Sequence, residues 1–334
     1  MNPLVSILIP AYNSQEWLAD TIQSAVAQSW PKKEIIIVDD GSTDRTLSVA
    51  RQFASRGVQV VTQANQGASA ARNAAFAACQ GDYIQWLDAD VLLEPGKVES
   101  HVRKIGECRS SRTLLSGAWG SFMHRTRKAQ FFPTPLWCNH APVEWLVRKM
   151  GQNLHMQTGN WLVSRELSTV AGPWDTRLWR DNDGEYFCRV VLASDGIHFV
   201  PEARSYYRRT GFKSMSYIGG SVKKLESLFL SITLNIRHLR SAEDSERTRS
   251  ACVKFIRVWL PEFYPYRIDL GEELKRIASE LGEPVEVPPL SWKYSWIGGM
   301  FGLGAGRRAQ TLMPRFKEAA MIAWDRAMLR LEKS

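Results

Sequence analysis

The sequence predicts an α/β protein with a Rossmann-like, mostly parallel sheet flanked by helices, followed by a helical C-terminal appendage. Strand-like apolar segments alternate with helix-like segments within the first stretch of about 90 residues. Residues typical of turns and helix caps separate these segments. After Gly220 the composition changes, and apolar residues recur at helical spacing only.

Four apolar stretches have the length and the β-branched content of buried strands. They are residues 4–9, where we expect Pro10 to end the strand, 34–38, 58–62 and 83–87. The three stretches between them carry caps and apolar residues at helical spacing: residues 14–26, 42–50 and 68–78. Strands joined by crossover helices pair in parallel, so we expect a parallel sheet covered by helices.

The rest of the chain is less regular. The pattern predicts strand at 114–132 and 161–163, helix at 143–150 and 183–194, strand at 197–200, and then a basic segment at 204–213. Further helices are expected at 225–239, 253–260 and 272–281, with a linker at 284–289 and a last helix from Pro314. We place a domain boundary near residue 219. Residues 1–219 then form one domain with halves 1–110 and 111–219, and residues 220–334 form the helical region.

Charge and composition limit the setting of the protein. The 334-residue chain is 44% hydrophobic and has a formal charge of +9, which favours an anionic partner without choosing among nucleotide phosphates, anionic lipid and nucleic acid. The five widely spaced cysteines indicate a reduced, cytoplasmic setting. No lysine or arginine precedes Lys32, so we expect no secretory signal. No apolar run approaches the roughly 20 residues that span a bilayer.

An aromatic and Gly-rich segment at 292–303 precedes Arg307 and Arg308. This mixture of aromatic and cationic residues is typical of segments that lie at a membrane surface. A helix docked on the main domain would have the same composition. Two interpretations of this segment therefore stay open: it places the protein in a peripheral position on the inner face of the membrane, or it is a helix docked on the main domain.

Polar side chains follow each predicted strand. Because ligands bind outside the carboxyl ends of parallel strands, these residues are expected to share one crevice. The side chains of Asp88 and Asp90 would point the same way along a continued strand, so their negative charges would repel each other. A solvated turn, a basic side chain or a metal ion would relieve the repulsion. The residues of this crevice are Tyr12 and Asn13, Asp39 and Asp40, residues 65–67, and Asp88 with Asp90.

Four segments in this order resemble the nucleotide-sugar half of glycosyltransferase family 2, which has the GT-A fold. They are residues 5–13 (VSILIPAYN), 38–44 (VDDGSTD), 65–73 (NQGASAARN) and 87–90 (LDAD). The resemblance covers residues 4–100 strongly and 150–215 more loosely. We find no Q-x-x-R-W segment and no series of membrane spans, so a non-processive enzyme that adds one sugar is implied.

The resemblance implies a donor site. Asp88 and Asp90 would form a D-x-D motif that holds Mn²⁺ or Mg²⁺ against the donor diphosphate, with Asp90 the direct ligand; hard cations prefer such oxygens. Asp39 would accept a hydrogen bond from the base, Tyr12 would stack on it, and Arg72 would contact base or phosphate. Each of these residues also has a purely structural interpretation. Asp88 and Asp90 would be solvated acids in a turn, Ser42 or Asp44 would cap a helix, and Arg72 would be a solvated helix arginine. The implied donor-binding residues are Pro10, Tyr12, Asn13, Asp39, Asp40, Gly67, Arg72, Asp88, Ala89 and Asp90.

Residues 178–189 resemble the acidic segment that opens a helix on the acceptor side of this family. Asp183 is implied as the catalytic base that an inverting transfer requires, with Asp181 and Glu185 as competing candidates. Simple helix capping is the alternative. Trp161 and Trp174 are candidates for an acceptor pocket, although tryptophans more often pack in a core. Residues 206–216 resemble a loop that closes over the diphosphate, with Arg208, Arg209 and Lys213 supplying positive charge.

The implied function is metal-dependent, inverting transfer of one sugar from a nucleotide-sugar donor to a saccharide or lipid-linked acceptor, in surface polysaccharide or glycoconjugate synthesis. The resemblance favours a uridine nucleotide as donor and no nucleic acid partner. Two alternatives remain. A sugar nucleotidyltransferase is expected to have a glycine-rich phosphate-binding loop after the first strand. Residues 10–13 (PAYN) do not form such a loop, which disfavours this alternative. A catalytically inert binding or scaffold subunit is disfavoured by the intact Asp88, Asp90 and Asp183.

Overall fold

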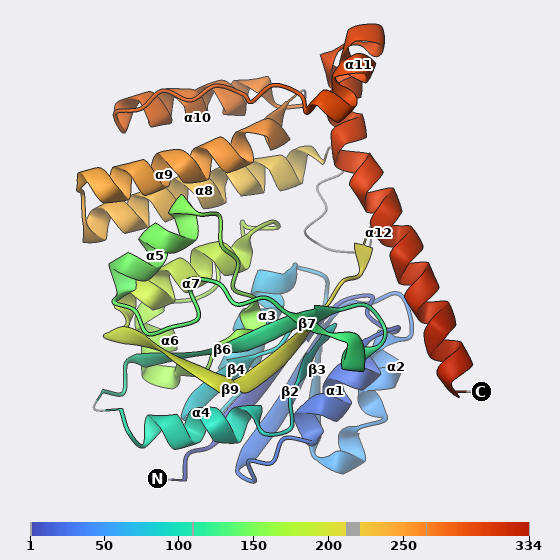
Figure 1. The fold of residues 1–334 in the computed structure, drawn as a ribbon. Coiled ribbons are helices and arrows are strands. Elements are labelled where there is room, and N and C mark those ends of the chain that lie inside the picture. The colour runs from blue at the N-terminus through green and yellow to red at the C-terminus, as the bar shows by residue number, and fades with distance from the viewer. Residues whose placement is uncertain (1, 109, 212–220, 265, 334) are drawn as a thin grey trace.

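The computed structural model describes residues 2–108, 110–211, 221–264 and 266–333, and its centre is a five-stranded sheet (Figure 1). The strand order is β3-β2-β1-β4-β8, and every pair is parallel except β4 with β8. This sheet confirms the predicted fold class. Its strands are β1 (Val5–Ala11), β2 (Lys33–Asp40), β3 (Val58–Gln63), β4 (Tyr83–Trp86) and β8 (Val163–Ser164).

Strand β1 runs through Pro10, so the expectation that this proline ends the strand is wrong. Pro10 is paired with Val38 of β2, but pairing with β4 stops at Leu8. Because Pro10 has no paired residue in β4, its lack of an N–H group costs no hydrogen bond to that strand. The extension carries β1 to the loop that begins at Tyr12.

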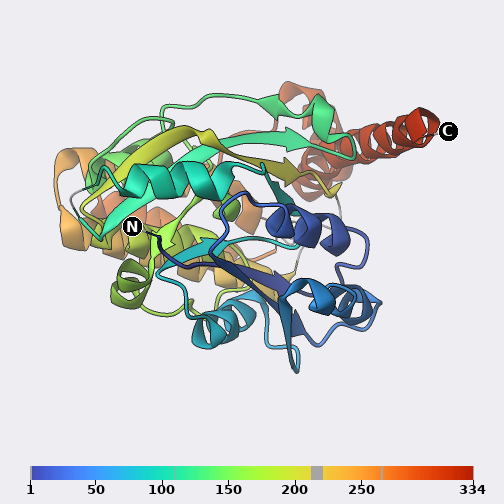
Figure 2. The same cartoon turned by 90° about the horizontal axis from the view of Figure 1, so that it is seen from below.

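Helices cover both faces of this sheet (Figure 2). The strands are buried on both sides, with Leu8 and Ile36 facing one hydrophobic cluster and Ile7 and Ile37 facing the other. This explains why the strands are apolar throughout instead of alternating. The helices of this half are α1 (Leu18–Val26), α2 (Thr46–Arg51), α3 (Ala68–Ala78) and α4 (Lys97–Ile105), with a 3₁₀ turn at Ala54–Arg56.

A second sheet of four strands, in the order β5-β9-β6-β7, carries the other half of the domain. The stretch predicted as strand at 114–132 is a hairpin, β6 (Thr113–Phe122) and β7 (Gln130–Phe131), with a 3₁₀ turn at Thr126–Lys128. Strand β9 (Gly196–Arg208) joins the predicted strand to the first half of the basic segment, and β5 is Val91–Leu93. This sheet brings Arg208 toward the donor half of the molecule.

Of the remaining helices, those within residues 222–280 form a layer above the sheets (Figure 1). Residues Leu228, Phe255 and Leu274 of the C-terminal helices belong to the same hydrophobic cluster as Trp145 and Val191. The helical region is therefore packed onto the main domain. The boundary predicted near residue 219 falls within 212–220, outside the described residues. The helices are α5 (Pro142–Gly151), α6 (Arg165–Ala171), α7 (Asn182–Ala193), α8 (Val222–Ala242), α9 (Glu246–Trp259) and α10 (Ile268–Glu280), with 3₁₀ turns at Thr158–Asn160 and Leu260–Phe263.

Two further helices, α11 (Trp292–Phe301) and α12 (Leu303–Lys333), end the chain. The expectation of a helix starting at Pro314 is wrong, because Pro314 lies inside α12. Proline suits the first turn of a helix and costs a hydrogen bond elsewhere. In α12 the helical hydrogen bonds on both sides of Pro314 outweigh the loss of this one bond. Among the described residues, no helix has the length and apolar character needed to cross a membrane.

Candidate functional site

The loops after β1 and β2 are tied together at the carboxyl edge of the sheet. Asn13 adopts a left-handed conformation with φ of 46°, and its Oδ1 accepts a hydrogen bond from the Thr43 N–H at 2.9 Å. The Asn13 N–H in turn donates to Ser42 Oγ at 3.0 Å. Tyr12 stands beside this junction with 48% of its surface exposed. The ring is therefore free to stack on a planar ligand.

Asp39 and Asp40 are both buried at the end of β2, but they have different roles. Asp39 Oδ2 accepts a long bond from the Ser42 N–H, while Asp39 Oδ1 is buried with no partner. A buried acceptor without a donor is costly, so a ligand N–H would be stabilising there. Asp40 is fully occupied by Gln63 Nε2 at 2.7 Å and by the N–H groups of Gln66 and Gly67. Asp40 thus holds the loop before α3.

Gly67 begins α3 with φ of +93°, a conformation that favours glycine. One turn further along α3, Arg72 is 5% exposed. Its Nη2 donates to Asp88 Oδ1 at 2.7 Å, and its guanidinium lies 4.3 Å from the centre of the Trp174 ring. The other two guanidinium nitrogens, Nε and Nη1, are buried without partners. These donors are suited to an anionic ligand such as a diphosphate.

Asp90 lies deep in the protein, yet part of its side chain stays accessible, as expected at the bottom of a cleft. Burial, and then the charge of Asp88, raise the pKa of Asp90 to about 7, against the opposing charge of Arg208. The peptide between the two acids is held by Thr21 Oγ1, which donates to the Ala89 carbonyl at 2.9 Å. The buried cation of Arg208 therefore does not fully compensate the two carboxylates.

The donor set fits a hard divalent cation, because carboxylate oxygens prefer such an ion and its charge would offset the repulsion by which Asp88 raises the pKa of Asp90. In the described part of the chain, no group of three or more His, Cys, Asp or Glu side chains forms a metal cluster. Asp88 and Asp90 supply two ligands at most. A cation held here would complete its coordination with water and with donor phosphate oxygens, as Mg²⁺ commonly does.

A cavity of about 230 Å³ lies on the acceptor side, where α5 and α7 meet α9. Asp183, in the first turn of α7, borders it with part of its side chain accessible. This volume is smaller than the roughly 300–1,000 Å³ of sites that enclose drug-sized ligands. The cavity therefore suits a smaller group, such as one sugar unit. The lining residues are Trp145, Lys149, Asn153, Leu154, His155, Met156, Trp161, Asp181, Asp183, Gly184, Phe187, Cys188, Phe255 and Trp259.

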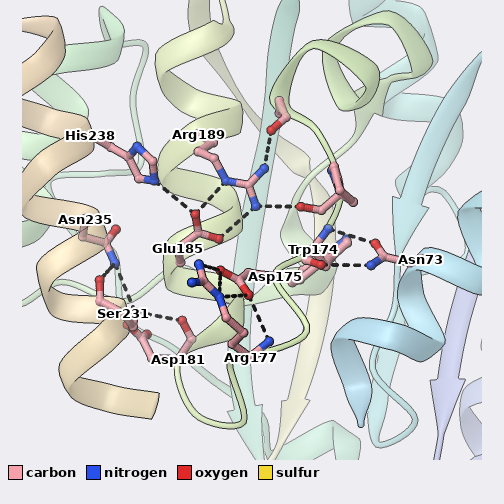
Figure 3. Close-up of polar contacts among 12 residues, drawn as sticks. Asn73, Trp174, Asp175, Arg177, Asp181, Glu185, Arg189, Ser231, Asn235 and His238 are labelled. Atoms are coloured by element: carbon pink, nitrogen blue, oxygen red, sulfur yellow. Dashed lines mark hydrogen bonds and ion pairs between the residues drawn. The ribbon is translucent and has the colours of Figure 1, made fainter. Parts of the chain in front are cut away.

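The first turn of α7 is held against α8, as Figure 3 shows. Asp181 precedes the helix with φ of 55°, and its Oδ2 accepts a hydrogen bond from Ser231 Oγ at 2.6 Å. Its carboxylate folds back over Gly184, where an added Cβ would lie 2.3 Å from Asp181 Oδ1. A side chain at position 184 would therefore displace the Asp181 carboxylate from this position. Burial raises the pKa of Asp181, with the charge of Lys149 opposing the shift.

Glu185 is buried behind this turn and paired with two cationic or polar partners (Figure 3). Arg189 Nε lies 2.7 Å and His238 Nε2 lies 3.2 Å from Glu185 Oε1. Burial acts to raise the pKa of Glu185, but the hydrogen bonds from His238 and Arg189 outweigh it and keep the pKa below its usual value. Of the three candidate acids, Glu185 alone does not border the cavity.

Two candidate tryptophans pack in the core. Trp161 is fully buried and stacks on Phe187, although it also borders the cavity. Trp174 is 2% exposed, and its backbone forms two hydrogen bonds of 2.9 Å with the Asn73 side chain, which join it to α3 (Figure 3). Trp174 therefore contributes to the donor side, by supporting Arg72.

The basic residues expected to close over the diphosphate are already engaged. Arg208 is 3% exposed, lies over the ring of Trp17, and pairs with Asp20 at 2.9 Å. Arg209 pairs with Glu318 of α12 at 2.9 Å. Lys213, together with residues 212–216 of the predicted loop, lies outside the described residues. Arg208 thus acts on the site through its charge near Asp90, from a fixed position on β9.

His155 is a site residue that the sequence interpretation missed. It borders the cavity. Many protein atoms lie around its ring, but the residue is still exposed to solvent. Burial lowers its pKa, and the charges of Asp183 and Asp88 both oppose this shift. His155 is therefore close enough to Asp183 and to Asp88 for both charges to act on it. A single histidine in a loop with no motif around it gives no signal in the sequence.

The sheet, the strand-end carboxylates and the neighbouring acidic helix define a glycosyltransferase domain. Residues 6–167, just under half of the chain, match the family model described as Glycosyl transferase family 2. Over this segment the match confirms the resemblance on which the sequence motifs were interpreted.

Known relatives match half of the chain or less. An uncharacterized glycosyltransferase of Haemophilus influenzae is 38% identical over 103 residues, covering 30% of this chain and 41% of the relative. The chondroitin synthase of Escherichia coli is 42% identical over 99 residues, covering 29% and 14%. The uncharacterized glycosyltransferase EpsJ of Bacillus subtilis is 30% identical over 169 residues, covering 50% and 48%. This chain therefore spans less than half of the length of each of these relatives.

Solved structures share the fold over more of the chain. S. aureus TarS 1–349 in complex with UDP-GlcNAc has a TM-score of 0.66 and 17% identity, covering 82% of this chain and 81% of that one. The mannosyltransferase PcManGT from Pyrobaculum calidifontis, in complex with GDP-Man and Mn²⁺, has a TM-score of 0.56 and 16% identity, covering 97% and 88%. At these identities the likeness establishes the fold.

Proposed function

We propose that this protein transfers one sugar from a nucleotide-sugar donor to a saccharide or lipid-linked acceptor, with inversion at the anomeric carbon. The observation that carries the proposal is that three buried polar atoms, Asp39 Oδ1 and Arg72 Nε and Nη1, lack partners at the sheet edge where Arg72 pairs with Asp88. The cavity that Asp183 borders supplies a candidate base for the acceptor. Neighbours with bound UDP-GlcNAc and GDP-Man support a nucleotide-sugar donor, and we take uridine as the first choice.

The donor is held at the carboxyl edge of the sheet. Asp39 Oδ1 accepts an N–H from the base, and Tyr12 stacks on it. The buried Nε and Nη1 of Arg72 donate to phosphate oxygens. Asp88 and Asp90 would hold Mn²⁺ or Mg²⁺, whose charge would offset the negative charge of the leaving diphosphate.

The transfer requires a base opposite the leaving group. The Asp183 carboxylate accepts the proton of the acceptor hydroxyl, and the hydroxyl oxygen forms a bond to the anomeric carbon. The bond from that carbon to the diphosphate breaks, and its electron pair stays on the diphosphate oxygen. Attack from the side opposite the diphosphate inverts the configuration. We place the reaction in the cytoplasm, in surface polysaccharide or glycoconjugate synthesis, in keeping with the similarity to a chondroitin synthase.

Thermal unfolding with a panel of nucleoside diphosphates and nucleotide sugars tests this function. A ligand that binds the folded state raises its stability, by about 2.7 kcal/mol at a concentration 100 times the Kd. We expect one nucleotide to raise the Tm when Mn²⁺ is present, and the rise to be lost on chelation and in Asp90→Asn. If no nucleotide raises the Tm with or without the cation, the proposed function is wrong.

Truncation of Trp259 is expected to weaken acceptor use selectively. Trp259 reaches the cavity from α9, and the Arg180 guanidinium lies 5.4 Å from its ring centre. In Trp259→Ala we expect the acceptor KM to rise about fivefold, since loss of an aromatic contact costs on the order of 1 kcal/mol. Donor hydrolysis in the absence of acceptor should be unchanged, with Val170→Ala, which changes an exposed residue of α6, as a control. Equal loss of donor hydrolysis would contradict this role.

A further inference from the structure

The last two helices carry most of the exposed apolar side chains on the described surface. Nine of its sixteen exposed large hydrophobic residues lie between Trp292 and Leu331. Trp292 is 79% exposed, Trp296 59% and Trp324 68%. A concentration of this kind marks an interaction surface.

The acidic residues of this region are all turned toward the main domain. Glu318 pairs with Arg209 at 2.9 Å, and Asp325 pairs with Arg125 at 2.7 Å. Glu332 pairs with Arg125 at 2.9 Å. These are the only three acidic residues in 292–333, against eight lysines and arginines. The ion pairs anchor one face of α12 and leave the region with excess positive charge.

The face of α12 away from these acids is apolar. Met313, Ala320 and Trp324 recur at intervals of seven and four residues, which places them on one side of the helix, and all three are exposed. Figure 1 shows α12 running along the edge of the molecule, and Figure 2 shows its C-terminal end projecting beyond the sheets. The outward face is therefore accessible along the length of the helix.

A groove of about 490 Å³ lies between α12 and the β6–β7 hairpin. Phe122, Met321 and Trp324 contribute apolar surface to it, while Lys128 and Lys317 contribute positive charge. Both lysines are exposed. Apolar surface combined with unneutralised cations is suited to an anionic amphiphile.

We propose that α11, the outward face of α12 and this groove form a docking surface for an anionic phospholipid bilayer, with the groove receiving a lipid headgroup. Charge complementarity favours this partner: a negative membrane surface attracts the cations, by about 1 kcal/mol for each lysine or arginine, while the tryptophans enter the interface. A second copy of the chain would bring like charges together. The proposal is independent of the donor chemistry.

Co-sedimentation of the full chain with vesicles tests the proposal. The probes are phosphatidylcholine vesicles with and without phosphatidylglycerol, at about 0.1 M and about 1 M salt, where the screening length falls from about 10 Å to about 3 Å. The variants are Trp296→Ala/Trp324→Ala for the apolar surface and Lys128→Glu/Lys317→Glu for the groove. Matched controls are Val170→Ala and Lys254→Glu, which change exposed residues on α6 and α9. Thermal unfolding and nucleotide binding of each variant show that it is folded.

We expect binding to the anionic vesicles alone, weakened at high salt, and at least about tenfold weaker in both double variants than in the controls. Binding that ignores phosphatidylglycerol, or that survives both double variants, overturns the proposal. A dimer detected by light scattering without lipid, and lost in Trp296→Ala/Trp324→Ala, would assign the surface to a second copy instead. Each of these results can be obtained whether or not the donor site proves active.

Discussion

Asp183→Asn is expected to abolish sugar transfer while leaving nucleotide binding intact. The amide cannot accept the acceptor proton, and a positioned general base contributes about 10² to 10⁴ in rate. Asp183 borders the cavity and stands outside the donor set, so the Kd of the nucleotide should change less than about twofold. Single-turnover formation of product and equilibrium binding of the nucleotide would be measured on the same preparation.

Asp181→Asn and Glu185→Gln are the matched controls. Asparagine at 181 can still accept from Ser231 Oγ, so transfer should fall only slightly. Glu185→Gln removes the charge that Arg189 and His238 face, and should lower stability by about 3 kcal/mol or more with little change in rate per folded molecule. Full activity in Asp183→Asn together with a large loss in Asp181→Asn would move the role of base to Asp181.

The donor half could be predicted from the sequence because its information is local. Each strand is directly followed by the residues that it delivers, so the alternation of strand and helix was enough to bring Asp39 and Asp88 to one edge. The division of labour between Asp39 and Asp40 could not be predicted. It depends on Gln63 and Gly67, which occupy Asp40 and leave Asp39 Oδ1 without a partner.

The acceptor side was less predictable because it is assembled from distant segments. Lys149, His155 and Trp259 come from α5, a loop and α9, and none of them lies in a motif. The turn at Asp181 depends on Ser231 of α8, fifty residues away along the chain. The capping alternative for this turn was open in the sequence; Asp181 holds the N-cap position but makes no side-chain capping bond.

Arg72→Met is expected to lower kcat/KM for the donor by about 10² to 10³, the loss seen when one preorganised donor to a developing anion is removed. The structure predicts an unusual result for stability. Without ligand, Arg72 keeps two buried N–H groups unpaired, each costing about 1–3 kcal/mol. Methionine removes that cost, while Asp88, whose side chain is 30% accessible, turns to water after losing its partner. The Tm of the free protein should therefore change little, and the rise produced by nucleotide should be lost.

Arg72→Lys separates the effect of charge from that of geometry. Lysine keeps the positive charge, but its single ammonium group cannot span Asp88 and a phosphate as the guanidinium fork does, so we expect kcat/KM closer to that of Arg72→Met than to that of the parent. Near-parental activity in Arg72→Lys would mean that charge alone suffices. If Arg72→Met instead unfolds several degrees earlier and keeps normal kcat/KM per folded molecule, the arginine supports the Trp174 contact and takes no part in donor binding.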